Sequence, residues 1–224
     1  MSKKLSELFH LCAYDIKYTN VKDWVSYAFL EEKDSLYIFF QGSCQPQDWY
    51  ANFAFKRRPY KDMQIPYRVH GGFLKAWKEV EDIIIAKICE DDDKGYKWKH
   101  ITIVGYSHGG ALCQFCVECI WYWRPDLREN GFEGYGFESP RMYGCMFVKK
   151  SLKERWANYT LIRCNNDLVT HCPPRLFGFT HVGQLLKIKG NTKLVDNKWI
   201  PRCVKSHYPQ VVYDALLKYE EEQD

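Results

Sequence analysis

The sequence has no long apolar stretch. None of its runs approaches the roughly 20 apolar residues that a membrane span requires, and Glu7, His10 and Asp15 interrupt the N-terminal segment where a secretion signal would be apolar. It also has no large excess of one charge, because 32 basic and 28 acidic residues leave a net charge of +4, too small to predict nucleic-acid binding. Repeats and long linkers are absent. We therefore expect one soluble, cytoplasmic domain over residues 1–224.

Cysteine, in contrast, is frequent, with ten residues that we expect to be reduced thiols in a cytoplasm. Cys113, Cys116 and Cys119 follow a C-x-x-C-x-x-C pattern, which can hold a metal or an iron–sulfur cluster. The same spacing places them along one face of a predicted helix, where small apolar side chains pack well, and no fourth ligand is obvious nearby. We favour the packing role and expect no metal.

Short runs of β-branched and aromatic residues predict strands at Ser35–Phe40 and His100–Gly105, and two more in FEGYGFES and YTLIRCN. Between the first two strands, apolar residues recur at helical spacing: Phe73, Trp77, Val80, Ile84 and Ile88. This alternation of strands and helices predicts an α/β fold with a mainly parallel central sheet flanked by helices.

The two ends of the chain are also predicted to be helical. The final segment, YPQVVYDALLKYEEEQD, is most simply a helix. An N-terminal amphipathic helix has one apolar face, formed by Leu5, Leu8, Phe9, Cys12 and Ile16. We treat residues 1–30 as a helical extension of the domain.

The segment TIVGYSHGGAL contains the pattern G-x-S-x-G at Gly105–Gly109. In this arrangement a strand enters a sharp turn, a serine sits at its apex, and a helix leaves it, so that the hydroxyl is held above the sheet as a nucleophile. Glycines flank the serine for steric reasons, since a side chain at either position would collide with the neighbouring strand or helix. Ser107 is therefore the candidate nucleophile, and a tight turn that happens to contain a serine is the alternative.

A serine needs a base within hydrogen-bonding reach and an acid that orients the base. In such a sheet the chain order is serine, acid, histidine. Asp167 follows a predicted strand and precedes a proline pair, which suits the acid, although a turn-forming aspartate has the same position. His171 lies only four residues from Asp167, and His181 lies at the start of another apparent strand, so we favour His207, which precedes the last helix.

From about Leu36 to Leu217 the sequence resembles the class 3 lipases, a family of α/β-hydrolases typified by fungal triacylglycerol lipases. The resemblance rests on six blocks in the family's order: IFFQGS, RVHGGFLKAW, VGYSHGGAL, GFESPRMYG, NNDLVTHCPP and SHYPQVVYDAL. The chain departs from the family pattern at a few positions: Gln41 stands for Arg, Tyr106 for His, His108 for Leu and Glu138 for Gly.

The resemblance implies that Ser107 is the nucleophile, Asp167 the orienting acid and His207 the general base. It also implies an oxyanion hole formed by Ser43 and the backbone N–H of His108. The family's lid corresponds to residues at about 44–62, where the candidate lid and substrate-binding residues are Trp49, Tyr50, Phe53 and Phe55. This segment could open on a lipid surface, and a helix packed permanently on the core is the alternative.

The expected activity is therefore a serine carboxylic-ester hydrolase acting on acyl esters such as acylglycerols, without a metal or organic cofactor. The expected partner is an ester or lipid substrate, with transient contact to a lipid interface. An acyltransferase or thioesterase using the same triad is an alternative, because nucleophiles other than water can intercept an acyl-enzyme. A non-catalytic lipid-binding protein of the same fold is the alternative from a different class.

Overall fold

The architecture was determined from a computed structural model, which describes residues 3–22, 25–42, 56–60, 67–93, 95–144 and 154–223. The strands of the main sheet are β1 (Thr19–Lys22), β2 (Val25–Glu32), β3 (Ser35–Phe40), β8 (His100–Tyr106), β9 (Phe132–Phe137), β11 (Tyr159–Cys164) and β12 (Gln184–Ile188). The shorter strands are β4 (Arg57–Pro59), β5 (Arg68–His70), β6 (Asp91–Asp92), β7 (Gly95–Tyr96) and β10 (Tyr143–Gly144). The α-helices are α1 (Leu5–His10), α3 (Gly71–Lys78), α4 (Glu81–Ile88), α5 (His108–Trp123), α7 (Arg202–Lys205) and α8 (Pro209–Glu221).

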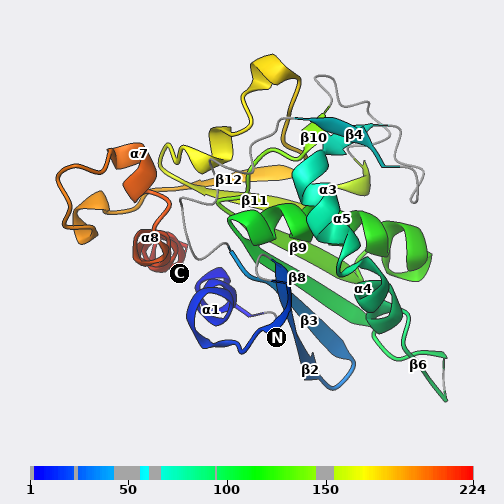
Figure 1. The fold of residues 1–224 in the computed structure, drawn as a ribbon. Helices are drawn as coiled ribbons and strands as arrows, with labels where there is room; N and C mark the ends of the chain where they lie inside the picture. The colour runs from blue at the N-terminus through cyan, green and yellow to red at the C-terminus, as the bar shows by residue number, and fades with distance from the viewer. Residues whose placement is uncertain are drawn as a thin grey trace.

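The main sheet has the order β1-β2-β3-β8-β9-β11-β12, and the five strands from β3 to β12 are parallel. Helices α3, α4 and α5 cover one face, and α1 and α8 cover the other (Figure 1). Side chains alternate between the two faces along β3, so that Ile38 packs under α5 while Phe39 packs in the cluster of α1 and α8. The predicted α/β fold with a mainly parallel sheet is confirmed.

Three cysteines of α5 lie in the core that this helix forms with the sheet. Cys113, Cys116 and Cys119 are each 0% exposed, and burial raises the pKa of each thiol. They therefore pack as small apolar side chains, as the favoured interpretation predicts. None of the helices in the described ranges is long and apolar enough to cross a membrane.

Two local predictions were wrong. The helical extension expected over residues 1–30 ends at Asp15, after α1 and a π-helical turn, and the chain then enters the antiparallel hairpin of β1 and β2. The hairpin forms because β2 finds the unpaired edge of β3, which no local periodicity reveals.

The apolar helix predicted from Phe73 onward is two helices, because the chain leaves α3 after Lys78 through i→i−3 hydrogen bonds from the N–H groups of Glu79 and Val80. The break keeps the apolar side chains of both halves buried, including Trp77 and Ile84.

Candidate active site

Ser107 lies at the turn between β8 and α5, at the carboxyl edge of the parallel strands (Figure 1). Its backbone has φ of 58° and ψ of −122°, a conformation that L-residues rarely adopt. The structure holds it there because the Ser107 N–H donates to the carbonyl of Phe137 at 2.8 Å while α5 begins at the next residue. The turn has the form of a nucleophile elbow.

The glycines on either side of Ser107 are required for steric reasons, as the sequence predicts. A Cβ on Gly105 would lie 2.1 Å from the carbonyl oxygen of Gly109, and a Cβ on Gly109 would lie 2.1 Å from that of Phe40. Both collisions are with backbone atoms, which cannot rotate away. The close approach of helix and strand that sets the direction of Ser107 therefore needs glycine at both positions.

Ser107, His207 and Asp167 form one hydrogen-bonded chain. Nε2 of His207 lies 2.8 Å from Oγ of Ser107, and Nδ1 lies 2.8 Å from Oδ2 of Asp167. Since a carboxylate can only accept, Nδ1 carries the proton and Nε2 accepts from the serine hydroxyl. Ser107 is 1% exposed and Asp167 is 0% exposed, so these bonds are shielded from water.

The acid and the histidine are each fixed by local backbone structure. Asp167 follows β11, where its N–H donates to the carbonyl of Cys164 and its Oδ1 accepts from the N–H of Val169 at 3.1 Å. His207 lies between α7 and α8, and its N–H donates to the carbonyl of Val204 at 3.0 Å. Both arrive at the carboxyl edge of the sheet because they follow parallel strands that end there.

The two other candidate histidines bond to the main chain. Nδ1–H of His171 donates to the carbonyl of Asp167 at 2.8 Å, and Nε2–H of His181 donates to that of Thr170 at 2.7 Å. Burial holds the pKa of His181 at about 3, so this ring stays neutral and structural. The structure thus brings His207, rather than these two, to Ser107.

Tyr106 takes part in the site in a way that the pattern did not indicate. Its hydroxyl donates to the carbonyl of His207, and its ring stacks on the imidazole with centroids 5.3 Å apart and an interplanar angle of 22°. Burial raises the pKa of Tyr106 well above its ordinary value, so the hydroxyl remains a donor. The sequence signal that could have indicated this role is that Tyr106 stands where the family pattern has histidine.

The predicted oxyanion hole is described in part. His108 is the first residue of α5, where a backbone N–H has no acceptor within the helix and points toward an approaching anion. Burial, together with the neighbouring His70, lowers the pKa of the His108 imidazole to about 4, so the ring is neutral near pH 7. Ser43 lies outside the described residues.

The predicted lid also lies mostly outside the described residues, and this part includes Trp49, Tyr50, Phe53 and Phe55. Of the segment at 44–62, the structure describes residues 56–60, which contain β4. This strand pairs with β5 and exposes Arg57 and Arg58.

A family model for class 3 lipases matches residues 37–177, which is more than half of the chain. The chain belongs to the class 3 lipase family. A lipase from Rhizomucor miehei is 27% identical over 162 residues, which are 72% of this chain and 44% of that protein. A secreted mono- and diacylglycerol lipase from Fusarium solani is 28% identical over 151 residues, 66% of this chain and 42% of that protein. The chain thus spans less than half the length of these curated relatives.

Solved structures of the family share the fold. The triacylglyceride lipase of Rhizomucor miehei superposes with a TM-score of 0.68 at 21% identity, covering 90% of this chain and 82% of that chain. A likeness at this identity supports the α/β-hydrolase fold alone.

The comparisons overturn the cytoplasmic location that we expected, because the Fusarium solani relative in this family is a secreted enzyme. The expectation was drawn from the charged residues near the N-terminus and from the cysteine content. A secreted enzyme in the same family shows that these two features do not decide the location of a class 3 lipase.

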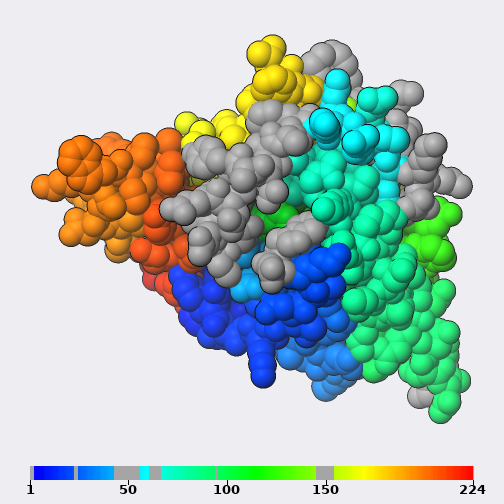
Figure 2. All heavy atoms as spheres, viewed as in Figure 1, coloured from blue at the N-terminus to red at the C-terminus, as the bar shows by residue number. Residues whose placement is uncertain are grey.

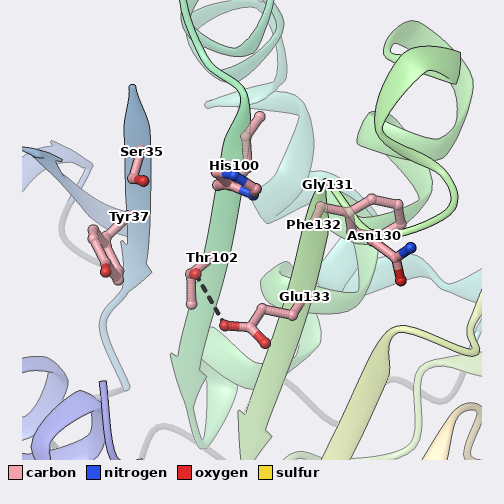
Figure 3. A pocket seen from close by; sticks show the side chains of 9 residues that line it. Ser35, Tyr37, His100, Thr102, Asn130, Gly131, Phe132 and Glu133 are labelled. Carbon is pink, nitrogen blue, oxygen red and sulfur yellow. Dashed lines mark hydrogen bonds between the residues drawn. The ribbon is translucent and has the colours of Figure 1, made fainter. Parts of the chain in front are cut away.

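A hollow of about 340 Å³ is seen from close by in Figure 3. It lies at the start of the parallel strands, whereas Ser107 follows the end of β8. Its lining comes from the first residues of β3, β8 and β9, including Tyr37, Thr102 and Glu133, and Thr102 donates a hydrogen bond to Glu133 at 3.2 Å. Five residues of strand separate Thr102 from Ser107, or roughly 17 Å. This hollow therefore lies apart from the candidate active site at Ser107.

Proposed function

We propose that this chain is a serine carboxylic-ester hydrolase of the lipase type, with Ser107 as nucleophile, His207 as general base and Asp167 as the orienting acid. The observation that carries the proposal is the pair of 2.8 Å hydrogen bonds joining the three side chains at the elbow. A structural serine would not need a buried carboxylate aimed at the far nitrogen of its histidine partner. Residues 1–224 act as a single α/β-hydrolase domain in this proposal.

The reaction follows from the positions of the groups. Oγ of Ser107 attacks the ester carbonyl carbon while Nε2 of His207 takes the hydroxyl proton, and the carbonyl oxygen becomes an anion that the His108 N–H faces. The C–O bond to the alcohol then breaks, and His207 gives its proton to the leaving oxygen. Water, deprotonated by His207, attacks the acyl-enzyme and releases the acid and free Ser107. Ser43 is proposed as the second oxyanion donor.

The proposed substrates are acylglycerols or related acyl esters. The relatives support this class, since one is a mono- and diacylglycerol lipase and another a triacylglyceride lipase. In this proposal the residues of the site carry out the steps above without a metal or organic cofactor.

We further propose that the carboxyl edge of the sheet contacts lipid. Leu176 is 90% exposed in the connection that leaves β11, and Trp199 is 94% exposed in the connection that leaves β12. The segment carrying Trp199 projects from the body of the molecule (Figure 2, orange). Large apolar side chains this exposed mark interaction surfaces, and both follow strands that end at the edge holding Ser107.

The first test is hydrolysis of a chain-length series of p-nitrophenyl esters by the wild type and by Ser107→Ala. We expect the variant to lose a factor of about 10⁴ or more with its fold unchanged, because removing the nucleophile disables the whole triad. A fluorophosphonate probe should label the wild type at Ser107. Equal inertness of both proteins and no labelling would refute hydrolysis and favour a lipid-binding role.

Two further experiments test the type of reaction and the proposed lipid-contacting surface. Competing alcohols and thiols added during turnover separate hydrolysis from acyl transfer, since an acyltransferase would form new esters in preference to free acid. Trp199→Ser and Leu176→Ser should weaken binding to phosphatidylcholine vesicles while leaving hydrolysis of a soluble short-chain ester intact. Unchanged vesicle binding in the double variant would refute the proposed contact surface.

A further inference from the structure

Glu138 is a buried carboxyl beside the triad, at a position where the family pattern has glycine. It follows β9 directly, its side chain is 0% exposed, and its φ of +52° is one that favours glycine. Atoms of Glu138, Asp167 and His207 lie within 4.8 Å of one another. Two carboxyls are therefore buried together at the acid end of the Ser107–His207–Asp167 chain.

The hydrogen bonds of Glu138 account for only one of its oxygens. Oε1 accepts from the N–H of Cys164 at the end of β11, while Oε2 has no hydrogen-bond partner among the described residues if both carboxyls are ionised. A buried polar atom without a partner is costly. A proton on Glu138 removes this cost, since the carboxylic acid can donate to the carboxylate of Asp167.

The charges around Glu138 favour the same protonation state. Burial, and then the negative charge of Asp167, raise the pKa of Glu138 well above its usual range. The other titratable groups facing it are Tyr106 from β8, Cys164 from β11 and His207, and burial raises the pKa of both Tyr106 and Cys164. Neither Tyr106 nor Cys164 can carry a positive charge, so one proton shared by the two carboxyls is the stable arrangement.

We propose that Glu138 is a positioning residue of the triad, which holds Asp167 in place by donating a carboxylic-acid hydrogen bond to it. Asp167 would then accept from the Val169 N–H, the His207 Nδ1–H and Glu138. Three donors fix the direction of its carboxylate, and this direction sets the orientation of the imidazole that faces Ser107. The inference rests on the proposed function for its kinetic consequence, whereas the hydrogen bond itself does not depend on it.

The test compares Glu138→Gln with Glu138→Gly. The amide of Gln can donate to Asp167 and accept from the Cys164 N–H, so Glu138→Gln should keep kcat within about threefold of the wild type. Glu138→Gly removes the donor but suits the positive φ, so the protein should still fold. Loss of a hydrogen bond to a charged group predicts a fall in kcat on the order of 10- to 100-fold, with KM unchanged because Glu138 does not face the substrate.

The matched control is Glu118, a carboxyl of α5 that is also 0% exposed and lies away from the triad. It forms an ion pair with Arg155 at 2.7 Å. Glu118→Gln and Glu118→Gly should change the melting temperature and leave kcat per folded molecule unchanged. A second readout is the low-field proton NMR resonance of the His207 Nδ1–H, which should persist in Glu138→Gln and shift or vanish in Glu138→Gly.

The outcomes separate the two proposals. An unchanged kcat and an unchanged resonance in Glu138→Gly would overturn the positioning role. A Glu138→Gln variant as impaired as Glu138→Gly would also overturn it, because that result would require an ionised Glu138. Failure of the wild type to hydrolyse esters or to react with a fluorophosphonate would refute the proposed function, and the NMR comparison would still decide the hydrogen bond.

Discussion

Tyr106 gives the sharpest test of how His207 is held. Tyr106→Phe keeps the ring stacked on the imidazole at 5.3 Å but removes the hydroxyl that donates to the His207 carbonyl. Leaving that acceptor without a partner should cost about 1–3 kcal/mol of the free energy of unfolding. If about 1.4 kcal/mol of this is lost from the transition state, kcat falls about tenfold.

The assay is kcat and KM on a soluble ester, with the free energy of unfolding measured in urea. KM should stay constant, because the hydroxyl bonds to the main chain and not to the substrate. Tyr18→Phe is the matched control, since the Tyr18 hydroxyl also donates to a main-chain carbonyl, that of Cys12 at 2.7 Å, without contacting the triad. A Tyr106→Phe variant that is destabilised like Tyr18→Phe yet has wild-type kcat would refute the claim that this bond positions His207.

Two more predictions concern stability. Gly105→Ala should lower the free energy of unfolding by about 3 kcal/mol, the upper end of the usual cost of overpacking, because the new Cβ would meet the Gly109 backbone at 2.1 Å. An unchanged urea midpoint would contradict this packing. Burial holds the pKa of His181 at about 3, below its ordinary 6.5, so the unfolded chain binds a proton that the folded chain does not as pH falls below 6.5. The contribution of His181 to stability is thus present above pH 6.5 and is lost toward pH 3. His181→Gln, which keeps a donor for Thr170, should reduce the dependence of the free energy of unfolding on pH by about 1.4 kcal/mol per pH unit between 6.5 and 4. Parallel pH dependences for wild type and variant would refute the burial of a neutral His181.

Local patterns in the sequence sufficed for much of the fold. The β-branched runs of β3 and β8 were identified within one residue, because each strand buries its own apolar side chains. The elbow was readable because its pattern is contiguous in the sequence, and Gly105 is required by its contact with Gly109, four residues later.

The hairpin of β1 and β2 was missed because its pairing partner, β3, decides it. A sheet edge can recruit a strand whose own sequence carries no clear alternation, and propensity alone then gives the wrong answer. The break between α3 and α4 was missed for a related reason, because continuous apolar spacing does not reveal where one helix ends and the next begins.

The sequence by itself determined which residue types were available to a triad and in which order they occur along the chain. Only the tertiary structure placed His207 against Ser107, 100 positions earlier in the chain, and brought Glu138 and Tyr106 around them. Such contacts join the ends of separate strands, so they depend on the order and register of the whole sheet. No local pattern contains that information, because the energy of each contact is realised only after the strands have paired.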